Sequence, residues 1–115
     1  MSATLTKILV VDDEPSIRRL LRTSLSSQGF QVVEAGDGHS ALSEVEGSRP
    51  DLVILDLGLP DISGLEMIRI LRTGGSVVPI LVLSSRTDEK GKVEALDLGA
   101  DDYVTKPFGT AELFA

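Results

Sequence analysis

Short apolar runs alternate with longer amphipathic stretches along the whole chain. The runs, rich in valine, isoleucine and leucine, occupy residues 8–11, 32–33, 52–55, 80–83 and 103–104. The run at 52–55 is apolar without alternation, which is typical of a strand that is covered on both faces. The pattern therefore predicts five short strands.

The stretch after the first run has the periodicity of an amphipathic helix. Ile17, Leu20, Leu21 and Leu25 follow i, i+3, i+4, i+8 spacing, and Gly29 can end the helix. Further helices are predicted over about residues 37–46, around residues 65–71 and over about residues 88–98, the last two ending at glycines.

A strand and a helix that repeat every ~20–25 residues indicate successive right-handed βαβ units. The chain is therefore predicted to be one α/β domain, residues 1–115, with a parallel sheet covered by helices on both faces. The fifth helix has barely begun, because residues 110–115 make fewer than two turns and so short a helix is unstable alone. We expect the last helix to be cut short in this chain.

Composition and charge exclude several classes of function. The 115 residues suffice for one domain, and 11 basic against 18 acidic residues give a net charge of −7, which disfavours binding to nucleic acid or anionic lipid. The absence of cysteine excludes disulfides, thiolate metal sites and thiol nucleophiles. No apolar run approaches the ~18 residues of a membrane span, and the N-terminus does not resemble a signal peptide. These features predict a cytoplasmic protein.

Carboxylates follow two of the predicted strands. Asp12 and Asp13 come after the first run and Asp56 after the third, while the fourth ends at Ser84 and Lys106 follows the fifth. In open α/β sheets, ligands bind beyond the carboxyl ends of the strands. If the first and third strands are neighbours, three carboxylates converge with a hydroxyl and an ammonium group beside them.

Such a cluster favours a cation. Three aspartates and one lysine leave a charge of about −2 in a small volume, and their repulsion destabilises the fold unless a cation is bound. The donors are oxygens, which suits a hard ion such as Mg²⁺, or Mn²⁺ in its place. A remaining carboxylate is then available as a nucleophile. Phosphoryl transfer uses these parts, with Asp56 attacking and Lys106 and Ser84 contacting phosphoryl oxygens.

Simpler interpretations exist for each residue alone. Asp12 and Asp13 before Pro15 are also typical of a helix N-terminus. Ser84 is compatible with a loop cap, and Tyr103 with static core packing. His39 is expected on the solvent side of the second helix rather than as a metal ligand.

Short motifs in a fixed order resemble the receiver domains of two-component response regulators. They are Val-Asp-Asp-Glu (11–14), Leu-Asp-Leu (55–57), Leu-Pro-Asp (59–61) with Gly64, Leu-Ser (83–84), Gly-Ala-Asp-Asp-Tyr (99–103) and Lys-Pro-Phe (106–108). The resemblance covers essentially the whole chain. It implies a flavodoxin-like (βα)5 doubly wound sheet with strand order 2-1-3-4-5.

The resemblance also implies roles for individual residues. Asp56 is the expected phosphoacceptor, and the metal is expected on Asp13, Asp56 and the backbone carbonyl of Gly58, with Asp12 acting mainly through metal-bound water. Ser84 and Tyr103 form the expected switch pair. Such a domain accepts a phosphoryl group from a sensor histidine kinase and releases it again, without turnover of an external substrate.

Residues 92–102 resemble the winged-helix (OmpR/PhoB-type) branch of response regulators, which dimerise through the fourth helix, fifth strand and fifth helix. The chain's expected contributions to that face are Lys92, Leu96, Asp97, Asp101, Asp102 and Glu112. The resemblance implies a C-terminal DNA-binding domain in the full-length protein. Residues 55–61 and 92–103 are similar to regulators of high-affinity potassium-transport operons.

Other functions compete with this interpretation. A stand-alone receiver that acts through protein contacts shares these motifs, but the short last helix and the dimer-face residues favour the transcriptional receiver. The intact set of Asp12, Asp13, Asp56, Ser84 and Lys106 argues against a receiver that signals without phosphate. Haloacid-dehalogenase-type phosphatases also use an aspartyl nucleophile and Mg²⁺, but they need a second aspartate two residues later, where this chain has Gly58.

Overall fold

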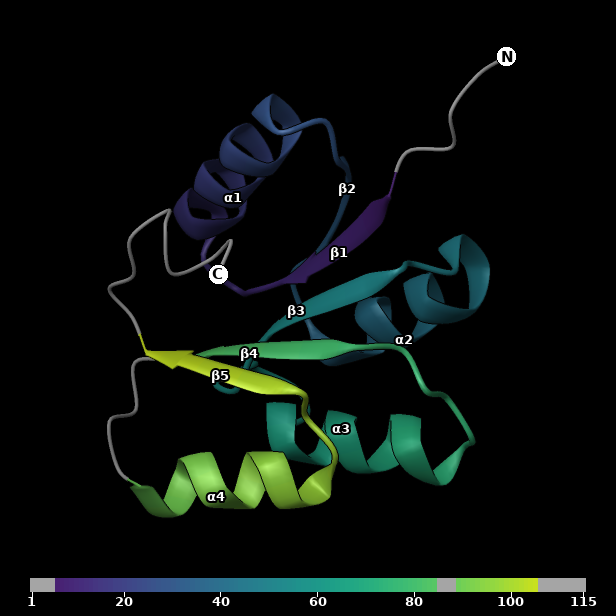
Figure 1. Ribbon diagram of the computed structural model, residues 1–115, viewed down its shortest axis with the longest axis vertical. Helices are drawn as coiled ribbons and strands as arrows, with labels where there is room; N and C mark the ends of the chain where they lie inside the picture. The colour runs from purple at the N-terminus through teal and green to yellow at the C-terminus, as the bar shows by residue number, and fades with distance from the viewer. Residues whose placement is uncertain (1–5, 85–88, 106–115) are drawn as a thin grey trace.

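A computed structural model describes residues 6–84 and 89–105 of the chain. Strands and helices alternate along these residues (Figure 1). The elements are β1 (Lys7–Val11), α1 (Pro15–Ser27), β2 (Gln31–Ala35), α2 (Gly38–Ser48), β3 (Leu52–Asp56), α3 (Gly64–Thr73), β4 (Ile80–Ser84), α4 (Glu89–Leu98) and β5 (Asp102–Thr105). The predicted alternation is confirmed. The predicted start of a fifth helix, residues 110–115, lies outside the described residues.

The strands form one parallel sheet in the order β2-β1-β3-β4-β5. This order confirms the predicted doubly wound fold. β1 and β3 are neighbours, with Val11 opposite Leu55, and Asp56 lies opposite Leu83 of β4. The carboxyl ends of β1, β3 and β4 therefore meet at one edge of the sheet.

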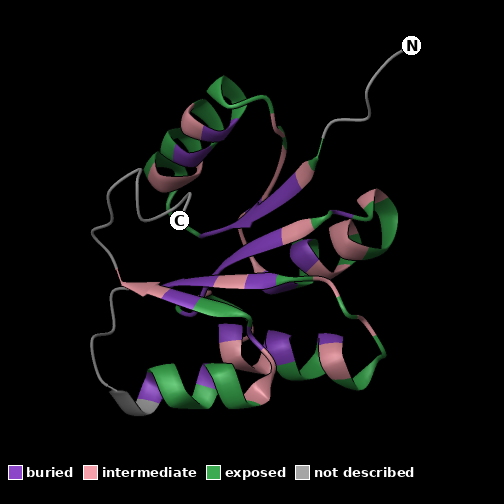
Figure 2. Ribbon diagram, viewed as in Figure 1, coloured by how far each residue is buried: buried purple, intermediate pink, exposed green. Residues whose placement is uncertain are grey.

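Helices cover both faces of the sheet, and the central strands are mostly buried between them (Figure 2). Residues of opposite parity along each strand fill two separate cores. Ile8, Val10 and Ile54 pack under α1 with its Leu21 and Leu25. The larger core lies on the other face, where α2, α3 and α4 contribute Ala41, Met67, Ile68, Leu71 and Ala95. Burial on both faces explains why the central strands are uniformly apolar.

The second strand is longer than its apolar run predicts. β2 pairs with β1 from Gln31 to Ala35, although the sequence pattern indicated only residues 32–33. β2 lies at the edge of the sheet, where polar side chains stay solvated while the backbone completes the ladder. Glu34 illustrates this, because its side chain is partly exposed and pairs with Arg18 and Arg22 of α1.

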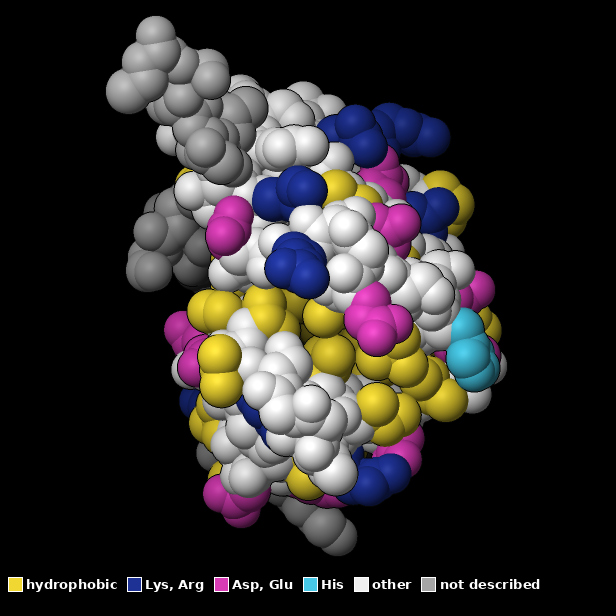
Figure 3. Space-filling model, turned by 90° about the vertical axis from the view of Figure 1, so that its right-hand side faces the viewer, with side chains coloured by type: hydrophobic (Ala, Val, Ile, Leu, Met, Phe, Trp, Pro, Cys, Tyr) yellow, Lys and Arg dark blue, Asp and Glu magenta, His cyan; other side chains and the backbone are white. Residues whose placement is uncertain are grey.

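Among the described residues, no helix is both long and apolar enough to cross a membrane. Apolar side chains gather across the middle of one face of the molecule (Figure 3). A groove of about 290 Å³ lies between α2 and α3, lined by Leu42, Val45, Glu46, Ile70, Leu71, Gly74 and Ser76. The groove shares no residue with the cluster of carboxylates at the strand ends.

Candidate phosphoacceptor and metal site

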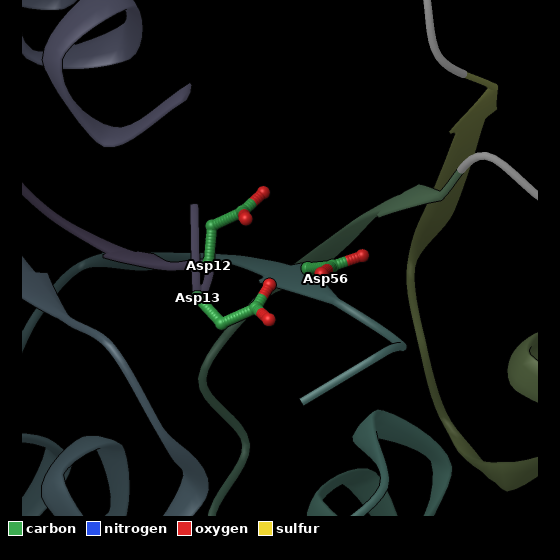
Figure 4. A group of neighbouring side chains, drawn as sticks. All are labelled: Asp12, Asp13 and Asp56. Atoms are coloured by element: carbon green, nitrogen blue, oxygen red, sulfur yellow. The ribbon is translucent and has the colours of Figure 1, made fainter. Parts of the chain in front are cut away.

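Three carboxylates converge at the carboxyl edge of the sheet (Figure 4). Asp12 and Asp13 follow β1, and Asp56 is the last residue of β3. One oxygen atom from each of the three carboxylates lies within 4.8 Å of those from the other two. Asp12 and Asp56 are buried, at 2% and 8% exposure, and Asp13 is exposed. The cluster therefore has a buried floor and one side open to solvent.

The turn after β1 explains how two successive aspartates reach this edge. The Asp12 amide still donates to the Ala35 carbonyl, at 3.1 Å, so the chain is held beside β2 up to this residue. The Asp12 side chain then accepts the Glu14 amide at 3.0 Å, immediately before α1 begins at Pro15. A proline at the first helical position lacks the N–H that would otherwise need a partner. Strand end and helix start are thus fixed within three residues.

An arginine supports the same turn and was not singled out from the sequence. The Arg18 guanidinium donates to the backbone carbonyl of Asp12 at 2.7 Å, and its Nε lies 3.3 Å from Glu34. Arg18 thus joins α1, β2 and the end of β1. The sequence places Arg18 in the first helix without showing that its side chain points back to the strand end.

The loop between β3 and α3 passes beside Asp56. A Cβ atom placed on Gly58 would lie 3.8 Å from Oδ2 of Asp56, so the Gly58 backbone is next to the carboxylate. The loop closes where the Gly64 amide donates to the Leu57 carbonyl at 2.9 Å. At Gly64 a Cβ would lie 2.6 Å from the Cα of Leu57, so this close approach requires glycine.

Ser84 and Tyr103 are both buried near this edge. Ser84 ends β4, one residue beyond the pairing of Asp56 with Leu83, and is 2% exposed. Tyr103 is 8% exposed and belongs to the larger core with Ala95 and Ala100. Lys106 lies outside the described residues, so its predicted place beside Asp56 stays a prediction.

The donor set suits a hard divalent cation. Mg²⁺ binds oxygens at 2.0–2.1 Å, so two ligands on opposite sides of the ion lie about 4.2 Å apart. One carboxylate oxygen from each of Asp12, Asp13 and Asp56 lies within 4.8 Å of the others, a spacing close to this separation. Mg²⁺ also retains several waters and phosphate oxygens, which the open side of the cluster admits.

Comparison with known proteins decides the family. The sequence model of the response regulator receiver domain matches residues 8–115. The chain belongs to this family. The family resemblance predicted from the sequence motifs is therefore confirmed.

Relatives and solved structures of the receiver domain agree with this assignment. The chain is 54% identical over 111 residues to the transcriptional regulatory protein KdpE of Mycobacterium tuberculosis, covering 96% of the chain and 49% of the relative. The KDP operon transcriptional regulatory protein KdpE of Escherichia coli is 53% identical over 111 residues, again covering 96% of this chain and 49% of the relative. The chain thus spans about half the length of these curated relatives. The structure of the Francisella response regulator 1452 receiver domain matches with a TM-score of 0.90 and 33% identity, covering 94% of this chain and 89% of that one.

The receiver domain presents most of the predicted dimer-face residues on its surface. Lys92, Leu96 and Asp97 are exposed on α4, and Asp101 and Asp102 are exposed at the start of β5. The Asp101 carboxylate contacts Arg72 of α3, and Asp102 accepts the amide of Tyr103. Glu112 lies outside the described residues. A role of these residues in dimerisation stays a prediction.

Proposed function

We propose that this receiver domain accepts a phosphoryl group on Asp56 in a reaction that depends on Mg²⁺. The observation that carries the proposal is the convergence of Asp12, Asp13 and Asp56 within 4.8 Å at the carboxyl ends of β1 and β3. Membership of the receiver family supports it. An enzyme that turns over an external substrate is not proposed, because the chemistry ends on the protein's own carboxylate.

The transfer needs a nucleophile and groups that stabilise the moving phosphoryl group. A carboxylate oxygen of Asp56 attacks phosphorus, an O–P bond forms, and the bond to the donor breaks as the leaving group departs with its electron pair. Asp13, Asp56 and the Gly58 carbonyl would hold Mg²⁺, with Asp12 acting through water. Bound Mg²⁺ supplies positive charge to the phosphoryl oxygens. Ser84 and Lys106 are the proposed donors to the other oxygens.

Family membership points to the source of the phosphoryl group and to the process that the phosphorylated protein controls. We infer that a sensor histidine kinase supplies the phosphoryl group, because the chain belongs to the receiver family of two-component response regulators. The names of those relatives, transcriptional regulatory proteins, favour control of transcription over a stand-alone receiver. We propose a KdpE-like regulator whose DNA-binding domain and phosphorylation-dependent dimerisation belong to the full-length protein, with Ser84 and Tyr103 as the switch pair.

The proposed function is tested by intact mass after incubation with a small-molecule phosphodonor. Gain of one phosphoryl group by the wild-type chain is expected only with Mg²⁺ present, and no gain is expected for Asp56→Asn. Asp51→Asn is the matched control, because Asp51 is an exposed aspartate at the opposite end of β3. Equal phosphorylation of Asp56→Asn and wild type would overturn the assignment of Asp56.

A further inference from the structure

One carboxylate outside the cluster of three aspartates accepts hydrogen bonds from two separate segments of the chain. Oδ1 of Asp61 accepts the amides of Gly38 and Ile62, each at 2.8 Å. Oδ2 of Asp61 accepts the His39 amide at 2.9 Å and also contacts Nδ1 of the His39 ring. Asp61 therefore joins the loop between β3 and α3 to the first residues of α2.

Electrostatics favour the ionised form of this carboxylate. The amide of Gly38, and after it those of His39 and Ile62, hold the pKa of Asp61 well below its usual range. The amides at the start of a helix carry the positive end of its dipole, which also favours an anion there. The link between loop and helix is thus a set of charge-assisted hydrogen bonds, which are stronger than neutral ones.

Close packing at the same point leaves the loop little freedom. A Cβ on Gly38 would lie 2.2 Å from Cγ1 of Ile62, so the loop rests directly on the helix backbone. The base of the loop is held separately, where the Gly64 amide donates to Leu57 at 2.9 Å. Gly58 lies between these two anchor points.

We propose that Asp61 is a positioning residue that fixes the Gly58 carbonyl for the metal site. This inference rests on the proposed function. Gly58 has no side chain and is exposed, so its orientation depends on how the loop is held at either end. Leu57 is buried and fixes one end, and Asp61 fixes the other. Without Asp61, the Gly58 carbonyl samples orientations that do not face the Asp56 carboxylate.

The experiment measures metal binding and phosphorylation separately. Mn²⁺ binding is followed by electron paramagnetic resonance for wild type, Asp61→Asn and Asp61→Ala. The initial rate of phosphorylation is then measured over a series of Mg²⁺ concentrations. Loss of a residue that orients a metal ligand lowers metal affinity by about tenfold or more. We expect Asp61→Ala to raise the half-saturating Mg²⁺ concentration by about this factor, while the rate at saturating Mg²⁺ stays close to that of wild type.

Two further variants separate positioning from helix stability. Asp37 caps the same helix by accepting the Ser40 amide at 2.7 Å, a contact made to α2 itself and not to the loop. Asp37→Ala is expected to lower stability in urea while leaving the half-saturating Mg²⁺ concentration unchanged. His39→Ala removes the ring contact and keeps the His39 amide, so its effect is expected to fall between those of wild type and Asp61→Ala.

Each outcome has a distinct meaning. A wild-type half-saturating Mg²⁺ concentration in Asp61→Ala would overturn the inference, as would an equal increase in Asp37→Ala. Loss of the rate at saturating Mg²⁺, without a change in Mn²⁺ affinity, would also overturn it. Failure of the wild-type chain to bind Mn²⁺ or accept phosphate would instead contradict the proposed function.

Discussion

The guanidinium of Arg72, in the last turn of α3, lies 3.2 Å from the carboxylate of Asp101, in the turn before β5. The same Asp101 oxygen accepts the Ile80 amide at 2.8 Å. Arg72 also donates to the backbone carbonyls of Gly99, Ser76 and Val78. One side chain thus ties the end of α3 to the segments that enter β4 and β5.

Replacement of Arg72 should therefore destabilise the domain more than replacement of an ordinary surface arginine. Arg72→Met keeps much of the aliphatic stem but leaves the half-buried carbonyls of Gly99 and Val78 without these donors. We expect a loss of about 2–3 kcal/mol in the free energy of unfolding, measured in urea. Arg69→Met is the control, since Arg69 pairs with Glu66 on the exposed side of the same helix, and little change is expected. Equal losses in the two variants would contradict the role of Arg72.

Addition of a methyl group at Gly64 should disturb the loop beside Asp56. The new Cβ would lie 2.6 Å from the Leu57 Cα and 2.7 Å from the Asp56 carbonyl oxygen, so the backbone must shift. Gly64→Ala is expected to cost about 1–3 kcal/mol of stability and to slow phosphorylation of Asp56.

Gly47→Ala provides the matched control. Gly47 lies in α2, and its added Cβ meets nothing within 4 Å. Replacement of an exposed helical glycine by alanine raises the free energy of unfolding by about 0.5–1 kcal/mol. The prediction for Gly64 is wrong if Gly64→Ala is as stable as wild type in urea and is phosphorylated at the wild-type rate.

Asp13→Asn should weaken the stabilisation of the domain by divalent cations. In EDTA the variant is expected to be at least as stable as wild type, because one of three clustered negative charges is removed. At Mg²⁺ ten times above its wild-type Kd, wild type gains about 1.4 kcal/mol of stability, and the variant should gain less than half of that. Glu14→Gln removes a nearby charge outside the cluster and should keep the full gain. Thermal unfolding of the two variants and wild type, with EDTA and with Mg²⁺, measures these gains.

Acid should weaken the hydrogen bonds by which the Asp61 carboxylate joins its loop to the start of α2. The amides of Gly38, His39 and Ile62 hold the pKa of Asp61 below its usual range in the folded protein. The carboxylate therefore contributes stability that is fully present above the unfolded pKa, about 3.9, and is lost as pH falls toward the folded value. Asp61→Asn should be less stable than wild type at pH 7, and the difference should shrink steadily below about pH 4. A difference that stays constant between pH 7 and pH 3 in urea titrations would contradict this.

The sequence was sufficient to predict the parts of the site that lie directly at strand ends. Asp12 and Asp56 follow apolar runs, and the carboxyl ends of parallel strands meet at one edge, so their convergence depends only on strand order. The helices α1, α3 and α4 end near the predicted glycines for a similar local reason. Gly29, for example, follows α1 with φ of 90°, which glycine adopts without strain.

The contacts of Arg18, Asp61 and Arg72 could not be predicted in the same way. Each depends on the path of a loop and on where a long or branched side chain turns after leaving its element. The Leu-Pro-Asp motif marks Asp61 as a residue of interest in the sequence. Nothing in the motif shows that its partners are the amides of Gly38 and His39. Asp101 likewise was expected at a dimer face, and its contact with Arg72 was not foreseen.

The pairing of β1 with β3 has a consequence for the order of events during folding. Asp12 and Asp56 come together only after the chain between them, including α1, β2 and α2, has been brought into place. Closing so long a segment costs chain entropy before the new contacts stabilise it, so pairings of this kind slow folding, and a cation that needs both aspartates can bind only after the pairing is made. Interactions absent from the transition state act on unfolding rather than on folding. A divalent cation held by these aspartates should therefore lengthen the lifetime of the native state and leave the speed of folding unchanged.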